Sequence, residues 1–388
     1  MRLIGRTLDQ IHSPIGAAHA LLAERTNDRP LLDLSQAAPS YPTAPVIADH
    51  IAAVARSADG GRYCPQQGLP ELLEVFAAEL SADYRGDVDP SQVLITAGCN
   101  QAFCLTVSAL ADPGDEVILP LPYYFNHDMW LRLEGINPVH LPTGADLMPE
   151  GEQAARLITD RTRAIVLVTP GNPSGATVPP ETIHAFAALA AEHDVALIID
   201  ETYRSFRPTT EPAHDLFARP RWDEQVISLH SFSKDLAIPG YRVGAVVGGP
   251  PLITEVMKLL DCVAICAPRI GQEAVIAGLT RANDWRRAHS GRIAAAQGIF
   301  EETMATRPGG FELTAAGAFF GWVRHPFEGE STQSVVRRLA VDHDVLTIPG
   351  VAFTPGDDRF LRFSFANLDA ADFVELDRRL NEMSAMGR

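Results

Sequence analysis

The stretch Ser231-Phe232-Ser233-Lys234-Asp235-Leu236-Ala237-Ile238-Pro239-Gly240-Tyr241-Arg242-Val243-Gly244 holds one of only two lysines in a chain of 388 residues that has thirty arginines. A chain that rarely uses lysine for surface charge places this one between small hydroxyl residues and a glycine-arginine turn. This context favours a chemical role for the Lys234 amine, because a buried lysine loses its proton readily and forms Schiff bases. A codon bias toward arginine would also make lysine scarce, so the pattern around Lys234 has to decide.

That pattern matches a known signature at each of its positions. Small residues stand three before and directly before Lys234, with Ile238 four after it, Gly240 six after it and Arg242 eight after it. The stretch resembles the pyridoxal-phosphate attachment site of the class I/II aminotransferases, the aspartate aminotransferase-like members of fold-type I. The resemblance implies that Lys234 holds pyridoxal 5'-phosphate as a Schiff base. It also implies an α/β fold, with a large domain built on a mostly parallel seven-stranded sheet flanked by helices and a smaller α+β domain.

Composition and charge limit the possible partners. The chain has 46% apolar and 21% charged residues, as soluble globular proteins do, and its length suits two domains that share a cleft. Its net charge of −17 argues against nucleic acid and anionic membranes, because both are bound through basic surface. We therefore expect neither nucleic acid nor membrane as a partner, and the resemblance implies small-molecule partners, an amino acid and a 2-oxo acid.

Targeting and metal signals are weak. No apolar run reaches the roughly 20 residues of a membrane-spanning helix, and the start MRLIGRTLDQIHSPIG lacks the apolar centre of a secretory signal. Five cysteines with no C-x-x-C pair favour reduced thiols, and twelve histidines include no H-E-x-x-H. The sequence predicts a cytoplasmic protein without a metal site.

Short apolar runs alternate with longer helical segments, which is typical of a mostly parallel sheet covered by helices. The predicted strands are 93–96, 116–119, 164–168, 195–199, 225–229 and 242–247. The predicted helices include 69–81, 100–110, 180–193 and 251–260. From about Asn283 an arginine- and alanine-rich helical stretch begins, followed by strand signals at 317–323 and 360–365 and a final helix at 370–383. We expect an N-terminal arm with part of the small domain at 1–44, a large cofactor-binding domain at 45–282 and a small domain at 283–388.

A candidate phosphate site combines a helix start with the lysine segment. In Thr96-Ala97-Gly98-Cys99-Asn100-Gln101-Ala102 a strand-end turn precedes a helix, whose free N–H groups and positive dipole end favour an anion. Gly98 permits a close backbone approach, while Cys99 and Asn100 offer amides. Arg242 can bind the same phosphate in a bidentate manner, and hydroxyl groups come from Ser231 and Ser233.

Three further segments supply residues for the cofactor ring. Asp200 follows the apolar run 195–199, and the resemblance implies that it pairs with the ring nitrogen and keeps the ring an electron sink. Tyr203 is expected to hydrogen-bond the ring hydroxyl oxygen, as is Asn172, which stands between two prolines and in the family also touches the substrate carboxylate. Tyr124 corresponds to an aromatic ring that stacks on the cofactor, whereas core packing remains open for its neighbours Tyr123 and Phe125.

The remaining matches concern the substrate and the neighbouring subunit. Tyr63 lies in a segment whose family counterpart reaches the phosphate of the other subunit, which implies a homodimer. Arg362 corresponds to the fork that holds the α-carboxylate of the amino acid. Ala37 stands where the family usually has glycine, close to the substrate, so substrate binding is the property it affects.

The predicted activity is transfer of an amino group between an L-amino acid and a 2-oxo acid by ping-pong kinetics, with Lys234, Asp200 and Tyr203 as the catalytic residues. A C–S β-lyase, a decarboxylase or a synthase on the same fold is the alternative, and a non-catalytic ligand-sensing protein is a more distant one. The substrate stays open among dicarboxylic, aromatic and small apolar amino acids. Phe319, Phe320 and Tyr41 are candidates for an apolar pocket or for core packing.

Overall fold

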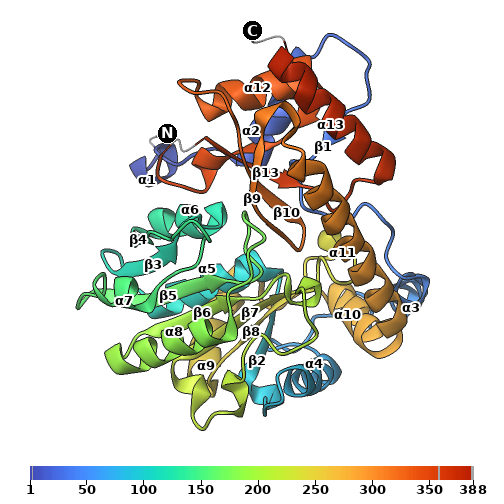
Figure 1. Ribbon diagram of the computed structural model, residues 1–388. Helices are drawn as coiled ribbons and strands as arrows, with labels where there is room; N and C mark the ends of the chain where they lie inside the picture. The colour runs from blue at the N-terminus through green and yellow to red at the C-terminus, as the bar shows by residue number, and fades with distance from the viewer. Residues whose placement is uncertain (2, 357–358, 386–388) are drawn as a thin grey trace.

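The structure is a computed structural model, and it describes residues 1, 3–356 and 359–385 (Figure 1). Its lower part in Figure 1 contains a seven-stranded sheet with the order β2-β8-β7-β6-β5-β3-β4. The strands are β2 (Val93–Thr96), β3 (Glu116–Pro120), β4 (Asn137–Leu141), β5 (Thr162–Val168), β6 (Ala196–Asp200), β7 (Val226–Ser231) and β8 (Gly244–Val247). β8 pairs antiparallel with both of its neighbours and the other pairs are parallel. The expectation of a mostly parallel seven-stranded sheet is confirmed.

Both faces of this sheet are buried, which explains why its inner strands β5 and β6 are largely apolar rather than alternating. In β6, Leu197 and Ile199 belong to one core, while Ile198 points to the other. The helices that cover the sheet are α4 (Pro70–Asp83), α5 (Cys99–Leu110), α6 (Phe125–Glu134), α7 (Gly151–Ala155), α8 (Pro180–His193), α9 (Pro250–Ala264) and α10 (Arg269–Arg281). Because the parallel strands end at one edge, the segments that follow β5, β6 and β7 meet there.

The upper part of Figure 1 is built on a four-stranded sheet with the order β12-β13-β10-β9. Its strands are β9 (Glu312–Gly317), β10 (Phe320–Arg324), β12 (Ile348–Pro349) and β13 (Phe360–Ser364), all paired antiparallel. Two short strands, β1 (Leu32–Asp33) and β11 (Val345–Leu346), pair in parallel beside it. The helices α12 (Thr332–Asp342) and α13 (Ala370–Ala385) pack with this sheet.

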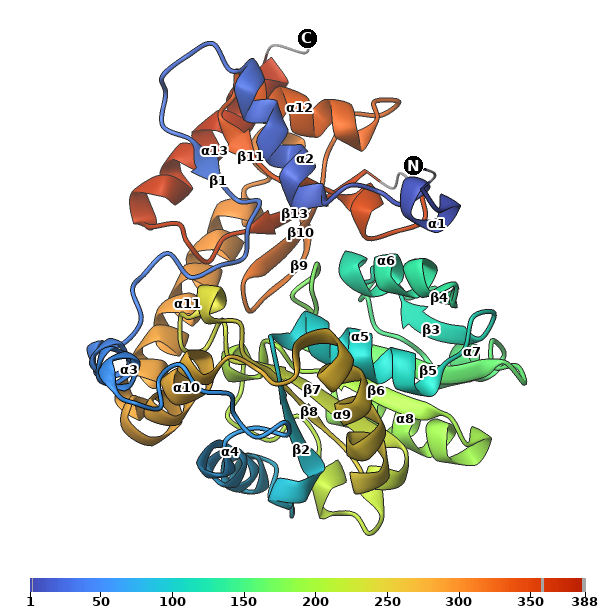
Figure 2. The same cartoon turned by 180° about the vertical axis from the view of Figure 1, so that it is seen from behind.

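The N-terminal segment belongs with the upper part. Its helix α2 (Pro14–Ala20) contacts β12, whereas the short α1 (Gly5–Leu8) lies beside α6, and Figure 2 shows the same segment from behind before the chain descends to α3 (Pro45–Arg56). The long helix α11 (Asn283–Ala305) runs from α10 in the lower part to β9 in the upper part. On this grouping we propose the domain division 45–282 and 283–388, with residues 1–44 as an arm that joins the small domain. Among the described residues no helix is long and apolar enough to cross a membrane.

Two sequence expectations need correction. The stretch 317–323 was expected to be a strand, but it contains the turn between β9 and β10, where Ala318 takes a positive φ of 49°. β4 had no counterpart among the predicted strands, because Asn137-Pro138-Val139-His140-Leu141 includes a proline and polar residues. As an edge strand, β4 tolerates both, since one of its sides has no pairing partner.

Candidate active site

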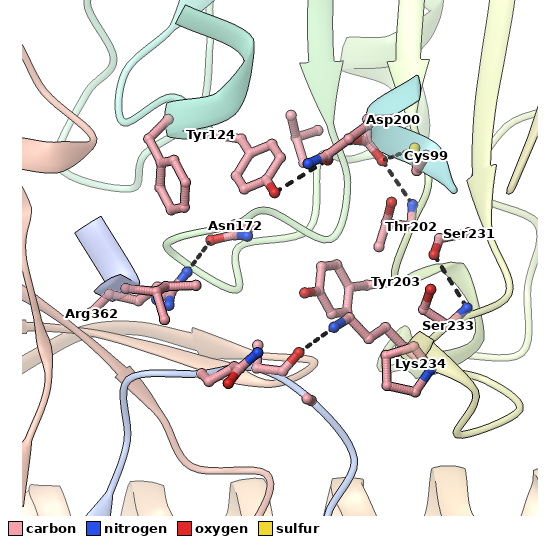
Figure 3. Close-up of a pocket in the computed structure, with 18 of the residues that line it drawn as sticks. Cys99, Tyr124, Asn172, Asp200, Thr202, Tyr203, Ser231, Ser233, Lys234 and Arg362 are labelled. Atoms are coloured by element: carbon pink, nitrogen blue, oxygen red, sulfur yellow. Dashed lines mark hydrogen bonds between the residues drawn. The ribbon is translucent and has the colours of Figure 1, made fainter. Parts of the chain in front are cut away.

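A cavity of about 280 Å³ opens where the segments after β5, β6 and β7 meet the upper part of the molecule. Of the fourteen predicted site residues, twelve line it: Ala37, Cys99, Asn100, Tyr124, Asn172, Asp200, Tyr203, Ser231, Ser233, Lys234, Arg242 and Arg362. Figure 3 shows ten of the lining residues as labelled side chains that point toward a common space. Residues spread over more than 300 positions of the sequence are thus brought together.

One end of the cavity is suited to a phosphate. Gly98 precedes the first turn of α5 with a φ of +92°, and a Cβ built on it would lie 2.2 Å from Arg242 Nη2. The Arg242 guanidinium donates to the carbonyl oxygens of Pro239 at 2.9 Å and Ala97 at 3.3 Å, which fix its position. Gly98 therefore contributes to the cavity by leaving room for Arg242, because only glycine allows the arginine this close to the start of the helix.

The turn after β7 adds two hydroxyl groups at the same end. The Ser233 backbone N–H donates to Ser231 Oγ at 3.3 Å, and both side chains line the cavity. Together with the free amides of α5 and the Arg242 guanidinium, these groups form a donor-rich surface for a phosphate.

Lys234 lies between this end and the upper part of the molecule. Its Nζ donates a hydrogen bond to the carbonyl oxygen of Ala37, so the lysine contacts the N-terminal loop. Burial lowers the pKa of Lys234 to about 8, and the charges of Arg362 and Arg242 act in the same direction. A lysine amine with this pKa is partly neutral near neutral pH and available as a nucleophile and base.

Asp200 ends β6 and is 4% exposed. Burial alone would raise its pKa, but His127, whose Nε2 lies 3.4 Å from Asp200 Oδ2, and Thr202 lower it below the usual value. The Thr202 backbone N–H donates to Asp200 Oδ1 at 3.0 Å, and Cys99 Sγ contacts the same oxygen at 3.6 Å. Asp200 is thus a buried carboxylate held in its ionised form beside the cavity.

Asn172 and Arg362 form the opposite side. Arg362, on β13, is only 2% exposed, and its Nη1 donates to Asn172 Oδ1 at 3.0 Å while Nη2 donates to the carbonyl oxygen of Ser35. Burial lowers the pKa of Arg362 to about 10. No carboxylate pairs with Arg362 among the described residues, and its buried Nε has no hydrogen-bond partner there. A carboxylate of a bound molecule would satisfy this guanidinium.

Two tyrosines close the space between these ends. Tyr124 precedes α6, its hydroxyl donates to Asn100 Oδ1 at 3.3 Å, and burial raises its pKa to about 12. Tyr203 is 4% exposed and packs on the rings of Phe319 and Phe320 at 5.5 and 5.1 Å. Both hydroxyl groups stay protonated at neutral pH and can act as donors.

Some residues named in the sequence analysis lie outside the cavity of their own chain. Tyr63 is 74% exposed and does not line the cavity of its own chain. Phe319 and Phe320 are fully buried in a cluster with Tyr41, so for these rings core packing is the role the structure gives. Tyr123 stacks on the His140 ring at 5.0 Å.

Sequence reasoning missed several cavity residues. Thr202 lines the cavity beside Asp200, and His127 contacts Asp200 from outside the cavity lining; both stand in stretches singled out for other residues. The remaining lining residues are Ile15, Gln36, Ala38, Phe125, Val168 and Pro239. Apolar and amide side chains carry little chemical signal in a sequence, and only the fold shows which of them face a cavity.

The cavity fits the expected cofactor. Pyridoxal phosphate needs an anion site, a partner for a ring nitrogen and an amine, and these are present in Gly98 with Arg242, in ionised Asp200 and in Lys234. The space that a Cβ at Gly98 would fill is bordered by the Arg242 guanidinium at the N-terminal end of α5.

Comparisons with known proteins agree with this geometry. The family profile described as aminotransferase class I and II matches residues 29–380. The chain is 30% identical to an aromatic aminotransferase of Arabidopsis thaliana, over 82% of this chain and 81% of that protein. It is also 30% identical to an aspartate aminotransferase of Streptomyces avermitilis, over 92% of this chain and 89% of that one. The chain therefore belongs to the class I and II aminotransferase family.

The fold agrees as well. The structure of aspartate aminotransferase from Thermus thermophilus with maleate superimposes with a TM-score of 0.89 at 26% identity, covering 99% of this chain and 100% of that one. The protein is accordingly a pyridoxal-phosphate-dependent aminotransferase of fold-type I, acting on an amino acid and a 2-oxo acid.

Proposed function

We propose that Lys234, Asp200, Asn172, Tyr203, Arg242 and Arg362 carry the transamination, and that the cavity in which they meet is the active site. The observation that supports this most is the convergence of an amine with a lowered pKa, a buried ionised carboxylate and a buried, carboxylate-free arginine on one cavity. Pyridoxal phosphate, when bound, supplies an aldehyde for the amino group and a ring that takes up an electron pair.

The chain's own residues divide the remaining work. Arg242, Ser231, Ser233 and the amides of Cys99 and Asn100 would bind the phosphate, with Gly98 giving them room. Asp200 would pair with the ring nitrogen and favour its protonated form, and Tyr203 and Asn172 would donate to the ring hydroxyl oxygen. Tyr124 would offer its aromatic face to the ring.

Arg362 orients the amino acid through its α-carboxylate, and Lys234 Nζ takes the proton from the α-carbon. Its pKa of about 8 suits this exchange, because both protonation states are populated near neutral pH.

The direct test is Lys234→Ala, compared with Lys258→Ala as a matched control. Lys258, the other lysine, lies exposed on α9 and pairs with Glu255 at 2.7 Å. We expect Lys234→Ala to lose covalent capture of the cofactor and essentially all turnover, while Lys258→Ala behaves as the parent enzyme. Substantial transamination by Lys234→Ala would overturn the assignment.

The lining of one protomer supports a substrate with an uncharged side chain. Its cations are Lys234, Arg242 and Arg362, and each has a proposed partner in the cofactor or the α-carboxylate. The walls left for the side chain include Ile15, Ala38 and Phe125 with the amides of Gln36 and Asn100. A second carboxylate would have no further cation among the lining residues that the structure describes, so we propose that apolar or aromatic amino acids react better than aspartate.

A panel of amino acids added to the cofactor-loaded enzyme tests this. Leucine, methionine and phenylalanine should yield their 2-oxo acids with a higher kcat/KM than aspartate. A clear preference for aspartate would contradict the substrate proposal but leave aminotransferase activity intact. Release of ammonia and pyruvate would indicate a lyase instead.

We further propose that the active unit is a homodimer in which Tyr63 reaches the phosphate of the neighbouring site. The support is an exposed apolar group, with Tyr63, Val263 and Ile265 exposed by 74, 65 and 45%. Arg269 Nη2 donates to the Tyr63 carbonyl oxygen at 3.4 Å, which joins the Tyr63 loop to α10.

The five cysteines are free thiols, which supports the proposal of a cytoplasmic location.

A further inference from the structure

Four charged side chains form a network outside the active-site cavity. They are Glu79 on α4, Arg204 in the short helix η3 (Arg204–Phe206), Asp235 in the turn after β7 and Arg286 in the first turn of α11, and they are 16, 10, 10 and 14% exposed. None of the four lines the active-site cavity. Two of them directly follow site residues in the sequence, since Asp235 follows Lys234 and Arg204 follows Tyr203.

Glu79 is the centre of this network because its carboxylate binds both arginines. Arg286 binds it in a bidentate manner, with Nη1 2.8 Å from Oε2 and Nη2 3.0 Å from Oε1, and Arg204 Nη2 donates to Oε1. Burial alone would raise the pKa of Glu79, but Arg204 and Arg286 outweigh burial and lower this pKa to about 2. The carboxylate is therefore ionised throughout the neutral range.

Arg286 also binds Asp235, in the turn that contains Lys234. Its Nε lies 2.8 Å and its Nη2 2.7 Å from Asp235 Oδ2. The same helix makes a second bond to the tyrosine side, because Ser290 Oγ donates to the Ser205 carbonyl oxygen at 2.7 Å. α4, the turn with Lys234, the turn with Tyr203 and the start of α11 are thus joined by charge-assisted bonds.

Glu79 is the buried carboxylate that both arginines share. Without it, two largely buried guanidinium groups would face each other across the place of the lost carboxylate, with Arg286 keeping only Asp235 and Arg204 keeping only the partly exposed Asp83. Breaking a buried ion pair by removing one partner costs more than a surface pair gains, because the remaining charge is left uncompensated. Relief requires Arg204 or Arg286 to move, and each movement shifts a backbone segment next to a site residue.

We propose that Glu79 is a positioning residue for the transamination, holding the Lys234 amine and the Tyr203 hydroxyl in register through Arg286–Asp235 and Arg204. This inference rests on the roles proposed above for Lys234 and Tyr203. It goes beyond them because Glu79 belongs to another helix and acts only through its neighbours. Small displacements of reacting groups are costly, since about 1 Å reduces a rate by as much as a hundredfold.

The test compares Glu79→Gln and Asp235→Asn with the parent enzyme. The measured quantities are the single-turnover rate of amino acid conversion without an acceptor, the KM for the amino acid, and the rate at which apoenzyme captures pyridoxal phosphate, trapped with borohydride. We expect both variants to slow conversion and capture about tenfold or more. KM should change little, because Arg362 and Asn172 do not contact the network.

Asp83→Asn is the matched control. Asp83 binds the same Arg204, through Nη1 at 2.5 Å, but it is 44% exposed and has no bond to Arg286. Its rates should stay within about twofold of the parent, as expected for an exposed ion pair. The double variant Glu79→Gln with Asp235→Asn should be no slower than the slower single variant, because both changes break one connection.

The outcomes separate the hypotheses. Parent-like rates in both Glu79→Gln and Asp235→Asn, together with a lowered melting temperature, would overturn the inference and leave a purely stabilising network. If Glu79→Gln does not fold, Asp235→Asn decides alone: slowed rates support the inference and parent-like rates overturn it. A parent enzyme without transamination, or an active Lys234→Ala variant, would instead overturn the function proposed for the site.

Discussion

Gly98 illustrates how one missing side chain shapes the phosphate end of the site. Its φ of +92° disfavours any side chain, and the space above it is occupied by the Arg242 guanidinium. Two separate physical reasons, backbone strain and collision with Arg242, therefore require glycine here. They can be separated by experiment, because Gly114 has nearly the same φ of +96° with nothing within 4 Å of its virtual Cβ.

We predict that Gly98→Ala weakens pyridoxal phosphate binding by at least about tenfold, because the new Cβ displaces the Arg242 guanidinium. The backbone strain of a side chain at this positive φ should also lower the free energy of unfolding by about 1 kcal/mol or more. The affinity is measured by titrating apoenzyme with the cofactor. Gly114→Ala should show a comparable loss in the free energy of unfolding with no change in this affinity. Equal cofactor affinity in both variants would show that Arg242 is not a phosphate ligand.

Burial of the Lys234 amine, which the proposed chemistry requires, lowers the free energy of unfolding. An ammonium group whose pKa falls from 10.5 to about 8 on folding is destabilising below pH 8, by about 3 kcal/mol at most. The hydrogen bond to the Ala37 carbonyl oxygen offsets about 1 kcal/mol of this.

We predict that Lys234→Met makes the apoenzyme more stable than the parent at pH 7 by about 1–3 kcal/mol, because no ammonium is buried. Between pH 8 and 10.5 the unfolded parent chain binds more protons than the folded one, so parent stability rises with pH and the difference disappears. Urea unfolding of both apoenzymes across this range is the measurement. A parent that is the more stable of the two at pH 7 would contradict the buried, desolvated state of Lys234.

At the scale of elements, the end of β6 is fixed by the residue after Asp200. Glu201 is 1% exposed, and its carboxylate accepts hydrogen bonds from the Tyr84 hydroxyl and from Ser228 Oγ at 2.7 Å, with His214 Nε2 at 3.5 Å. Burial opposes its ionisation, but these neighbours lower the pKa of Glu201 well below its usual value. The end of β6 is thereby tied to β7 and to the end of α4.

We predict that Tyr84→Phe lowers the free energy of unfolding by about 1–3 kcal/mol at neutral pH, because a buried carboxylate loses a donor. Glu201 has a depressed pKa when folded, so the stability it contributes is present above pH 4.5 and is lost as the pH falls through its folded pKa. The difference between variant and parent should therefore shrink in acid. Urea unfolding at several pH values checks this, and an unchanged free energy at pH 7 would exclude the proposed support.

The elements that could be predicted from the sequence were those with a strong local pattern. Fully apolar runs such as 164–168 and 195–199 correspond to β5 and β6, because buried parallel strands need apolar residues on both faces. The turn between β9 and β10 is predicted as strand because apolar residues surround Gly317, whose turn signal was not used. In the structure Gly317 packs against Gly175, since a Cβ on Gly317 would lie 2.2 Å from the Gly175 carbonyl oxygen.

At the site, the family resemblance identified residues with distinctive side-chain chemistry, and twelve of these fourteen residues line the cavity in the structure. His127 escaped notice because its approach to Asp200 depends on how α6 packs on α5, which no local spacing encodes. Glu79 escaped for the same reason, as its partners lie more than 120 positions away.

At the scale of the whole molecule, the exposed Tyr63 supports the proposal that the active unit is a homodimer. We predict that a hybrid dimer of Tyr63→Ala and Lys234→Ala chains regains about half of the parent activity, because one of its two sites then has both residues intact. Co-expression with two affinity tags isolates the hybrid, and each variant alone serves as the control. An inactive hybrid would show that Tyr63 does not act across the interface.

The scarcity of lysine has a practical consequence for the folded enzyme. Lys258 lies on α9 with a 67% exposed side chain, whereas the Lys234 amine is engaged once the cofactor is bound. A reagent directed at amines then finds one side chain to modify, apart from the chain's amino terminus. With the amino terminus blocked, the loaded enzyme is suited to attachment of a dye or a solid support at Lys258, away from the reacting groups.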